Sequence, residues 1–458
     1  MMRISEIRPA RRLRRTTAAA ALTAAALGLS ACAEGMAPAS APAGSNAPAA
    51  AAAPGGDSVK VGSGKVGSGK VGSGKVGALG CETGKGHGRS QVCKLTPALA
   101  AKLDQAVRRV LAEADLPGAV VGLWTSGGRY VRAFGVSDMA TRQPMNARLR
   151  FRIGSITKTF TVTALLELVD RHKARLDDPV SRYVSGVPGG DRITLRQLAE
   201  MRSGLFSYTE DPGFDHDLKA DPQRAFSPRQ LLAYAFKHPA IAKPGTVFQY
   251  SNTNTVLLGL VVEKLSGGPL GAYLRARVFK PGRLRHTTFP ATAEFPKPHA
   301  DGYTVQSVNG ELANATDWNP SWGWSAGAAI SDLDDMHTWA RALAKGSLLK
   351  RATQAQRLKL LPTGYPGTGY GLGIFGVNGW IGHNGSLPGY ESVAMYLPSA
   401  KATLVVLVNT DVLHKGAQPS TLLAEAVTAI ATPKNVYSLP AAPTAAAPRP
   451  SSTATLHG

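Results

Sequence analysis

Phe151-Arg-Ile-Gly-Ser155-Ile-Thr-Lys158-Thr-Phe160 opens a long apolar segment that continues with few polar interruptions to Val169. A helix that is apolar on most sides belongs to a protein core rather than to a surface. Ser155 and Lys158 are three positions apart, so their side chains project from the same face of such a helix. The N–H groups of its first turn have no partner within the helix and are free to bind a developing oxyanion. A Ser-x-x-Lys pair in this setting is one way to build an activated nucleophile.

Two other serines occur in motifs that could compete for this role. Ser347–Lys350 is a second Ser-x-x-Lys pair, but it has no comparable apolar setting, and we interpret it as a loop at a helix end. Ser325 lies in Gly323-Trp-Ser-Ala-Gly327, which matches the G-x-S-x-G elbow of α/β-hydrolases. That elbow requires a preceding strand, whereas Asp317–Ser321 is turn-like, so we do not expect Ser325 to be the nucleophile.

Two downstream motifs carry further polar groups. Tyr250-Ser251-Asn252 leads directly into the apolar segment Val256–Leu265, and taken alone it is a helix N-cap. His383-Asn384-Gly385-Ser386 follows a predicted strand, and taken alone it is a turn, since Asn-Gly commonly makes one. Together with the Ser155 motif, in this order along the chain, the two motifs predict an active site.

The secondary-structure signals predict strands near both ends of the folded region and helices between them. A first helix begins at Thr96-Pro97. Strands are expected at 119–124, 130–136, 370–375, 380–383, 391–397 and 403–408, and a last helix at 422–430. From residue 176 to about 324 helix starts dominate, including a capping box at Thr194–Gln197 and Ser227-Pro228. We therefore expect an α/β (α+β) fold, in which a sheet domain (95–175 and 325–432) is interrupted by a mostly helical insert (176–324).

Residues 1–31 are typical of an export signal, with a basic start and an apolar segment that is too short to span a membrane. The paired arginines fit both Sec and Tat export. Leu29-Ser-Ala-Cys32 resembles a bacterial lipobox, which would make Cys32 the lipidated first residue of the mature protein. The alternative is an ordinary signal peptide in which Cys32 is incidental. We expect a lipoprotein at the outer face of the cytoplasmic membrane, in the periplasm or in the cell wall, with its lipid as the only membrane contact.

Residues 32–94 are predicted to form a flexible tether. A five-residue repeat, Val61–Lys65, recurs through residue 75 and imitates a phosphate-binding loop, but Val71 stands where a magnesium-binding Ser or Thr is needed. Cys81 and Cys93 flank a Gly-rich loop that contains His87. In an exported protein we expect these cysteines to form a disulfide rather than a metal site, for which no fourth ligand is evident. The Pro/Ala/Ser-rich residues 433–458 are predicted to be disordered.

The chain has 458 residues and a formal net charge of +22, or +17 when residues 1–31, with six Arg and one Glu, are set aside. Such a surplus favours anionic surroundings. The basic residues are scattered and no nucleic-acid-binding module accompanies them, so we expect adhesion to an anionic cell envelope and no nucleic-acid partner. The histidines form no His-Glu-x-x-His motif, and no metal or other cofactor is expected. We expect a monomer.

The three motifs resemble those of the penicillin-recognising serine hydrolases: Ser155-Ile-Thr-Lys158, Tyr250-Ser-Asn252 and His383-Asn-Gly385. Within that superfamily the chain is most similar to the exported serine D-alanyl-D-alanine carboxypeptidases, relatives of the class C β-lactamases. The resemblance covers roughly residues 95–432 and implies a β-lactamase/transpeptidase-like fold. It also implies that the substrate is a peptidoglycan stem peptide or a β-lactam.

The resemblance also implies a role for each residue. Ser155 would form the acyl-enzyme, and a desolvated Lys158 would take its proton. Tyr250 would protonate the leaving amine and later help to activate water. The N–H groups of Ser155 and Ser386 would form the oxyanion hole, Asn252 would bind the substrate amide and Lys158, His383 and Asn384 would face the terminal carboxylate, and Trp322 or Trp324 would line the cleft.

One motif departs from the superfamily. Many relatives have Lys-Thr-Gly where this chain has His383-Asn384-Gly385, and a His is charged only part of the time near neutral pH. This departure favours a peptidase over a β-lactamase and leaves esterase chemistry open. A third hypothesis is a non-catalytic wall-binding lipoprotein, which would have no chemical need for Ser155, Lys158 and Tyr250 together.

Overall fold

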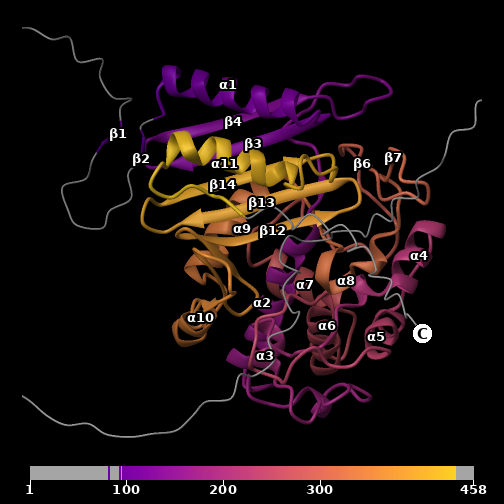
Figure 1. The fold of residues 1–458 in the computed structure, drawn as a ribbon. Coiled ribbons are helices and arrows are strands. Elements are labelled where there is room, and N and C mark those ends of the chain that lie inside the picture. The colour runs from indigo at the N-terminus through magenta and orange to yellow at the C-terminus, as the bar shows by residue number, and fades with distance from the viewer. Residues whose placement is uncertain (1–80, 83–91, 94, 440–458) are drawn as a thin grey trace, which may run out of the picture.

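The computed structural model describes residues 81–82, 92–93 and 95–439. Its centre is an eight-stranded antiparallel sheet with helices on both faces (Figure 1), which confirms the predicted α/β (α+β) fold class. The strand order is β4-β3-β14-β13-β12-β11-β10-β9. These strands are β3 (Gly118–Thr125), β4 (Gly128–Gly135), β9 (Leu361–Pro362), β10 (Thr368–Tyr370), β11 (Phe375–Val377), β12 (Trp380–Leu387), β13 (Tyr390–Leu397) and β14 (Ala402–Val408).

Helices α1 and α11 cover one face of the sheet, whereas α9 covers the other face with α2 and the remaining helices beyond it (Figure 1). The long helices are α1 (Pro97–Glu113), α2 (Thr157–Asp170), α6 (Asn252–Ser266), α9 (Leu333–Lys345) and α11 (Pro419–Ala431). The shorter ones are α3 (Leu195–Ala199), α4 (Pro212–Ala220), α5 (Pro228–Phe236), α7 (Leu270–Leu274), α8 (Trp324–Gly327) and α10 (Arg351–Arg357). Two short pairings complete the larger body: β5 (Phe151–Arg152) with β8 (Ile330–Ser331), and β6 (Tyr303–Thr304) with β7 (Ala313–Asn314).

The burial of each strand follows from its position in the sheet. Every residue of β13 and β14 is buried, because helices cover both faces of these central strands. Strand β4 lies at the sheet edge and has mixed exposure. The sequence pattern accordingly changes from continuous apolar runs in the centre to interrupted ones at the edge.

The predicted helix starts are confirmed by their caps. The Thr96 hydroxyl accepts a hydrogen bond from the Leu99 N–H at the start of α1. The capping boxes expected for α3 and α5 are both present. Helix α9 is capped by Asp332, whose carboxylate accepts from the N–H of Asp335. These local signals are short-range hydrogen bonds, which is why the sequence alone reveals them.

Two predictions were wrong. The strand expected at 370–375 is two strands, β10 and β11, joined by a tight turn in which Gly373 has a positive φ of 61°. The disordered tail was expected from residue 433, but residues 433–439 are packed against the fold. Tyr437 is buried, and the Trp380 indole N–H donates to the Asn435 carbonyl at 2.7 Å. A short aromatic-poor segment gives no pattern by which such packing could be foreseen.

Several predictions concern residues outside the described part of the chain: the export signal 1–31, Cys32, the Val61–Lys65 repeat and His87. The backbones of Cys81 and Cys93 face each other in the two-stranded pairing of β1 (Cys81–Glu82) with β2 (Val92–Cys93), but their side chains are not described, so the disulfide stays a prediction. The division into a sheet domain and a helical insert also stays a prediction. No helix within the described residues has both the length and the apolar character needed to cross a membrane.

The site is positioned by a very close approach between two backbone segments. The 3-10 turn η1 (Gly154–Ile156), which precedes α2, packs directly against β12. A Cβ atom at Gly385 would lie 2.1 Å from the Ile153 carbonyl oxygen, and a Cβ at Gly154 would lie 2.8 Å from the Ser386 nitrogen. The Ser392 hydroxyl on β13 also donates to the Ile153 carbonyl at 2.9 Å. Only glycine therefore allows both segments to meet at this point.

We expect Gly385→Ala to destabilise the fold by about 1–3 kcal/mol, because the added methyl group meets backbone atoms that cannot move aside easily. It should also slow acylation of Ser155 about tenfold or more, because β12 must shift away from η1. Gly268→Ala is the matched control, since a Cβ there would meet no atom within 4 Å. Thermal unfolding and acylation rate should be measured for both variants; equal effects would contradict the packing argument.

Candidate active site

Ser155 and Lys158 form a buried pair at the start of α2. The Lys158 Nζ atom donates to the Ser155 Oγ at 2.8 Å and to the Ala326 carbonyl oxygen at 2.9 Å. Ser155 is 4% exposed and Lys158 is fully buried. The Ala326 carbonyl belongs to the short helix α8, so a second segment of the chain holds the amine against the hydroxyl.

The charge state of Lys158 follows from its surroundings. No carboxylate forms an ion pair with it among the described residues, and burial lowers the pKa of its amine well below the usual range. The Nζ atom lies 4.9 Å from the centre of the Tyr250 ring. Because desolvation penalises the ammonium form, the neutral amine is favoured, and a neutral amine can accept the proton of Ser155.

Tyr250 is placed beside this pair by the residues that start α6. Its side chain is 3% exposed, and burial raises the pKa of its phenol above the usual range, while the nearby Ser155 hydroxyl lowers it in part. Its hydroxyl is close enough to Ser155 for this effect, yet it makes no hydrogen bond of ordinary geometry within the described residues. The phenol is therefore protonated at neutral pH and can give a proton to a leaving group.

Two backbone amides flank the position that a reacting carbonyl would take. A Cβ at Gly385 would lie 2.8 Å from the Ser155 nitrogen, and the corresponding atom at Gly154 would lie 2.8 Å from the Ser386 nitrogen. Strand β11 pairs with β12 only up to Gly382. Beyond that residue, no other strand of the described chain pairs with this edge of β12. The arrangement suits an oxyanion hole made of two N–H groups.

His383 faces the catalytic residues but carries no charge. Its Nε2 lies 3.0 Å from the Tyr370 hydroxyl, and its ring centre is 6.3 Å from that of Tyr250. Burial, followed by the proximity of Lys158, lowers the pKa of His383 to about 3. The sequence suggested a histidine charged part of the time near neutral pH; that expectation is wrong, because the ring is 1% exposed and has no carboxylate partner.

Asn384 points away from His383, because successive residues of a strand face opposite sides of the sheet. Its amide donates to the Gln418 Oε1 at 3.3 Å, just before α11. The two residues that the sequence assigned together to a substrate carboxylate are thus separated by the sheet. The joint assignment was made because the two residues are adjacent in the sequence, and adjacency does not put two strand residues on the same face of a sheet.

Asn252 also differs from its predicted contacts. Its amide nitrogen donates to the Thr209 Oγ1 at 3.0 Å, and its backbone N–H donates to the Ser207 hydroxyl at 3.1 Å. The predicted hydrogen bond to Lys158 is not formed among the described residues, because Lys158 is held by Ser155 and Ala326. The side-chain oxygen of Asn252 is left to accept from a substrate amide.

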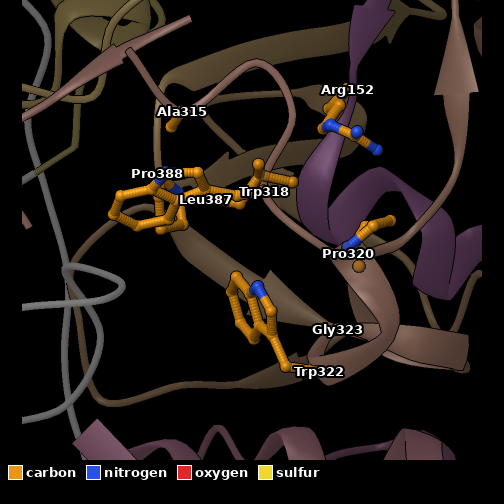
Figure 2. A pocket seen from close by; sticks show the side chains of 9 residues that line it. Arg152, Ala315, Trp318, Pro320, Trp322, Gly323, Leu387 and Pro388 are labelled. Atoms are coloured by element: carbon orange, nitrogen blue, oxygen red, sulfur yellow. The ribbon is translucent and has the colours of Figure 1, made fainter. Parts of the chain in front are cut away.

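A narrow cavity next to these residues is walled by aromatic side chains and a buried arginine (Figure 2). Trp322 lines it, whereas Trp324 does not and packs on α6, where a Cβ at Gly259 would lie 2.8 Å from its ring. The cavity adjoins the catalytic centre, because Leu387 follows Ser386 and Gly327 follows Ala326. Its lining consists of Arg152, Ala315, Trp318, Pro320, Trp322, Gly323, Gly327, Leu387 and Pro388.

The sequence did not single out Arg152, Trp318 or the Ala326 carbonyl. Arg152 is 2% exposed; its Nη2 donates to two backbone carbonyls at 3.1 Å each, while its Nε and Nη1 have no partner in the described residues. The available sequence signal for Arg152 was its position inside the apolar run that contains the nucleophile. Ala326 had a signal too, since it follows Ser325 in the rejected elbow motif.

Ser325 and one further cluster have structural roles. Ser325 is fully buried, its hydroxyl donates to the Thr255 carbonyl at 2.9 Å, and a 3-10 turn rather than a strand precedes it. His286, Asp332 and Asp335 lie close enough to hold a metal ion. Asp332 caps α9, however, and Asp335 accepts hydrogen bonds from the backbone N–H groups of residues 285–287. These bonds explain the cluster without an ion.

Comparison with known proteins agrees with this geometry. Residues 103–428 match the family model described as Beta-lactamase. Among curated proteins, "Putative penicillin-binding protein PbpX" of Bacillus subtilis (strain 168) is 27% identical over 278 residues, which covers 61% of this chain and 66% of that protein. The chain thus spans slightly less than two thirds of the length of this curated relative.

Two solved structures resemble the whole folded region. The D-stereospecific amidohydrolase from a Streptomyces species is 33% identical, with a TM-score of 0.65, over 72% of this chain and 98% of that one. The D-amino acid amidase from Ochrobactrum anthropi SV3, in complex with D-phenylalanine, is 25% identical, with a TM-score of 0.63, over 72% and 97%. Both likenesses extend over nearly the full length of the other protein.

We expect Ser155→Ala to abolish acylation and Ser325→Ala to leave it within about twofold, because only Ser155 contacts a buried neutral amine. Intact-mass measurement after incubation with benzylpenicillin distinguishes the two. Lys158→Met should retain the fold, because it fills the buried site without a charge, while slowing acylation by about a hundredfold or more, since a thioether is not a base that can accept the proton. An adduct on the Ser155→Ala variant would show that another residue is the nucleophile.

Proposed function

The chain belongs to the β-lactamase family of serine hydrolases, and from that premise we propose that it hydrolyses an amide bond adjacent to a D-amino acid residue. The proposal depends above all on the 2.8 Å contact between the Ser155 hydroxyl and a fully buried Lys158 amine that has no carboxylate partner among the described residues. That pair supplies the nucleophile and the base for acyl transfer.

In the proposed reaction, neutral Lys158 takes the Ser155 proton as Oγ attacks the substrate carbonyl. The new C–O bond pushes negative charge onto the carbonyl oxygen, where the N–H groups of Ser155 and Ser386 stabilise it; one such donor contributes about 3 kcal/mol to the transition state. Tyr250 gives its proton to the departing amine, which leaves an ester on Ser155. Water, deprotonated by the same groups, then releases the acid and restores Ser155.

The preference for a D-amino acid amide comes from two supports. The amidohydrolase from Streptomyces and the amidase from Ochrobactrum are named for D-stereospecific and D-amino acid amide substrates, and the chain resembles both over most of its folded length. In addition, neither residue that the sequence assigned to a terminal carboxylate provides a positive charge: His383 is neutral, and Asn384 is bound to Gln418. An amide substrate needs no such charge.

A second candidate is the D-alanyl-D-alanine carboxypeptidase that the sequence motifs first indicated, acting on peptidoglycan stem peptides. The similarity to a protein named for penicillin binding and the arrangement of the three motifs favour it. β-Lactam or ester hydrolysis would use the same groups, whereas a non-catalytic wall-binding protein would not need them. In either case we propose an exported lipoprotein, anchored through Cys32 and held near an anionic envelope by its positive charge.

We expect D-phenylalanine amide and D-alanine amide to be hydrolysed at least about a hundredfold faster than their L-forms. Release of ammonia measures the first activity, and release of D-alanine from a diacyl-L-Lys-D-Ala-D-Ala peptide measures carboxypeptidase activity. Faster turnover of the peptide would favour the second candidate. Rapid loss of a benzylpenicillin adduct would indicate a β-lactamase, and turnover of short acyl esters alone an esterase.

A pure binding protein would show none of these activities while still retaining muropeptide. The Ser155→Ala variant is the control for every assay, because it keeps the cleft but lacks the nucleophile. Activity that persists in this variant would come from a contaminant and would count against the proposal.

A further inference from the structure

A buried glutamate lies on the side of the sheet opposite the nucleophile, directly behind the oxyanion position. Glu391 on β13 is paired across the ladder with Ser386 on β12, so the two side chains project from the same face. The neighbouring pair, Gly385 with Ser392, is oriented towards η1, as the bond from Ser392 to Ile153 shows. Glu391 therefore points towards α11, away from Ser155.

The carboxyl group of Glu391 joins β13, the strand that pairs with β12, to α11. Its Oε2 accepts a hydrogen bond at 2.9 Å from the N–H of Ser420, in the first turn of α11. A carboxyl group at a helix N-terminus satisfies one of the amides that lack a partner within the helix. The Asn384–Gln418 bond links β12 itself to the N-cap residue of α11. The start of α11 is thus linked to β12 directly through Asn384, and through Glu391 to β13, the strand that pairs with β12.

We propose that Glu391 is a positioning residue for the reaction: its buried carboxyl group holds Ser386 and the start of α11 in the register that places the Ser386 amide beside Ser155. This inference rests on the proposed function. Glu391 is 1% exposed, and its Oε1 has no hydrogen-bond partner in the described part of the chain. The Ser386 hydroxyl lies near enough to influence its ionisation.

The protonated form of Glu391 is the one that suits this role. Burial raises its pKa to about 8, and the negative charge of Asp411 adds to the shift, while the Ser420 N–H and the hydroxyls of Ser420 and Ser386 oppose it. Tyr437, in the segment after α11, also faces Glu391, and its own pKa is raised. Above pH 8 the carboxyl group would become an anion behind the oxyanion hole, where it would repel the charge that develops on the substrate.

The stability of the fold should also fall as pH rises. The folded-state pKa of about 8 lies above the ordinary value of a glutamate, so between roughly pH 4 and pH 8 the folded state binds more protons than the unfolded state. The free energy of unfolding therefore falls as pH rises through this window. Gln at this position cannot ionise, but it retains an acceptor oxygen and places an N–H₂ group where the acid carries its O–H.

The test is the pH dependence of kcat on D-phenylalanine amide for the full chain, with folding checked at each pH. Wild type should lose kcat about 30-fold between pH 7 and pH 9.5, as one group with a pKa near 8 predicts, with KM unchanged. Glu391→Gln should match wild type within about twofold at pH 7 and stay level to pH 9.5. Glu391→Ala should lower kcat about tenfold at pH 7 and leave KM within about twofold.

Two further variants sharpen the result. Asp411→Asn removes a negative charge near Glu391, so the pKa of Glu391 should fall and the loss of kcat should begin at lower pH. Glu425→Gln, on the half-buried side of α11, is the matched control and should show the same loss of kcat with pH as wild type. Three results would overturn the role of Glu391 in an active enzyme. They are a loss of kcat above pH 8 that persists in Glu391→Gln, a wild-type kcat that does not change with pH, and a Glu391→Ala variant with full kcat. A wild type that hydrolyses no amide and takes no acyl group would instead overturn the proposed function, and this role with it.

Discussion

The catalytic arrangement depends on a backbone-to-backbone contact that leaves no room for a side chain. The turn η1 and strand β12 are about 230 residues apart in the sequence, yet a methyl group at Gly385 would lie 2.1 Å from the Ile153 carbonyl. This contact puts the Ser155 and Ser386 amides next to each other. It also fixes the start of α2, and with it the position of Lys158 relative to α8. One steric constraint therefore sets both the nucleophile and the groups that receive the negative charge.

Hydrogen bonds on both faces of the sheet hold this contact in place. On the α2 side, the Ser392 hydroxyl bonds the Ile153 carbonyl, and the Ala326 carbonyl holds Lys158. On the α11 side, Glu391 and Asn384 bond the start of the helix. Because β13 is buried along its whole length, it transmits displacement rather than absorbing it. A change on the α11 face can therefore alter geometry at Ser155 without touching a substrate.

The sequence predicted the sheet, most helix starts and the three motifs, because these depend on local periodicity and capping. It predicted Ser155, Lys158 and Tyr250 as one group, and the structure places them together. It failed where the outcome depends on tertiary surroundings. The pKa of His383 depends on burial by Tyr370 and Tyr250. The side-chain orientation of Asn384 follows from the alternation of residues along β12, a strand that is longer than the one predicted at 380–383. Arg152 and the Ala326 carbonyl gave no residue-type signal strong enough to separate them from the core.

The titratable groups nearest the reaction centre share one property, which is that burial favours the neutral form of each. Lys158 and His383 have lowered pKa values, whereas Tyr250 and Glu391 have raised ones. In a chain with a net charge of +22, these four groups thus carry no full charge at neutral pH, whereas Arg152 in the adjoining cavity remains a cation. In the proposed reaction, negative charge forms on the substrate oxygen as Lys158 takes the Ser155 proton, and it forms where two fixed N–H groups already point. In a low-dielectric site those dipoles need no reorganisation, so their stabilisation acts on the transition state rather than on the bound substrate.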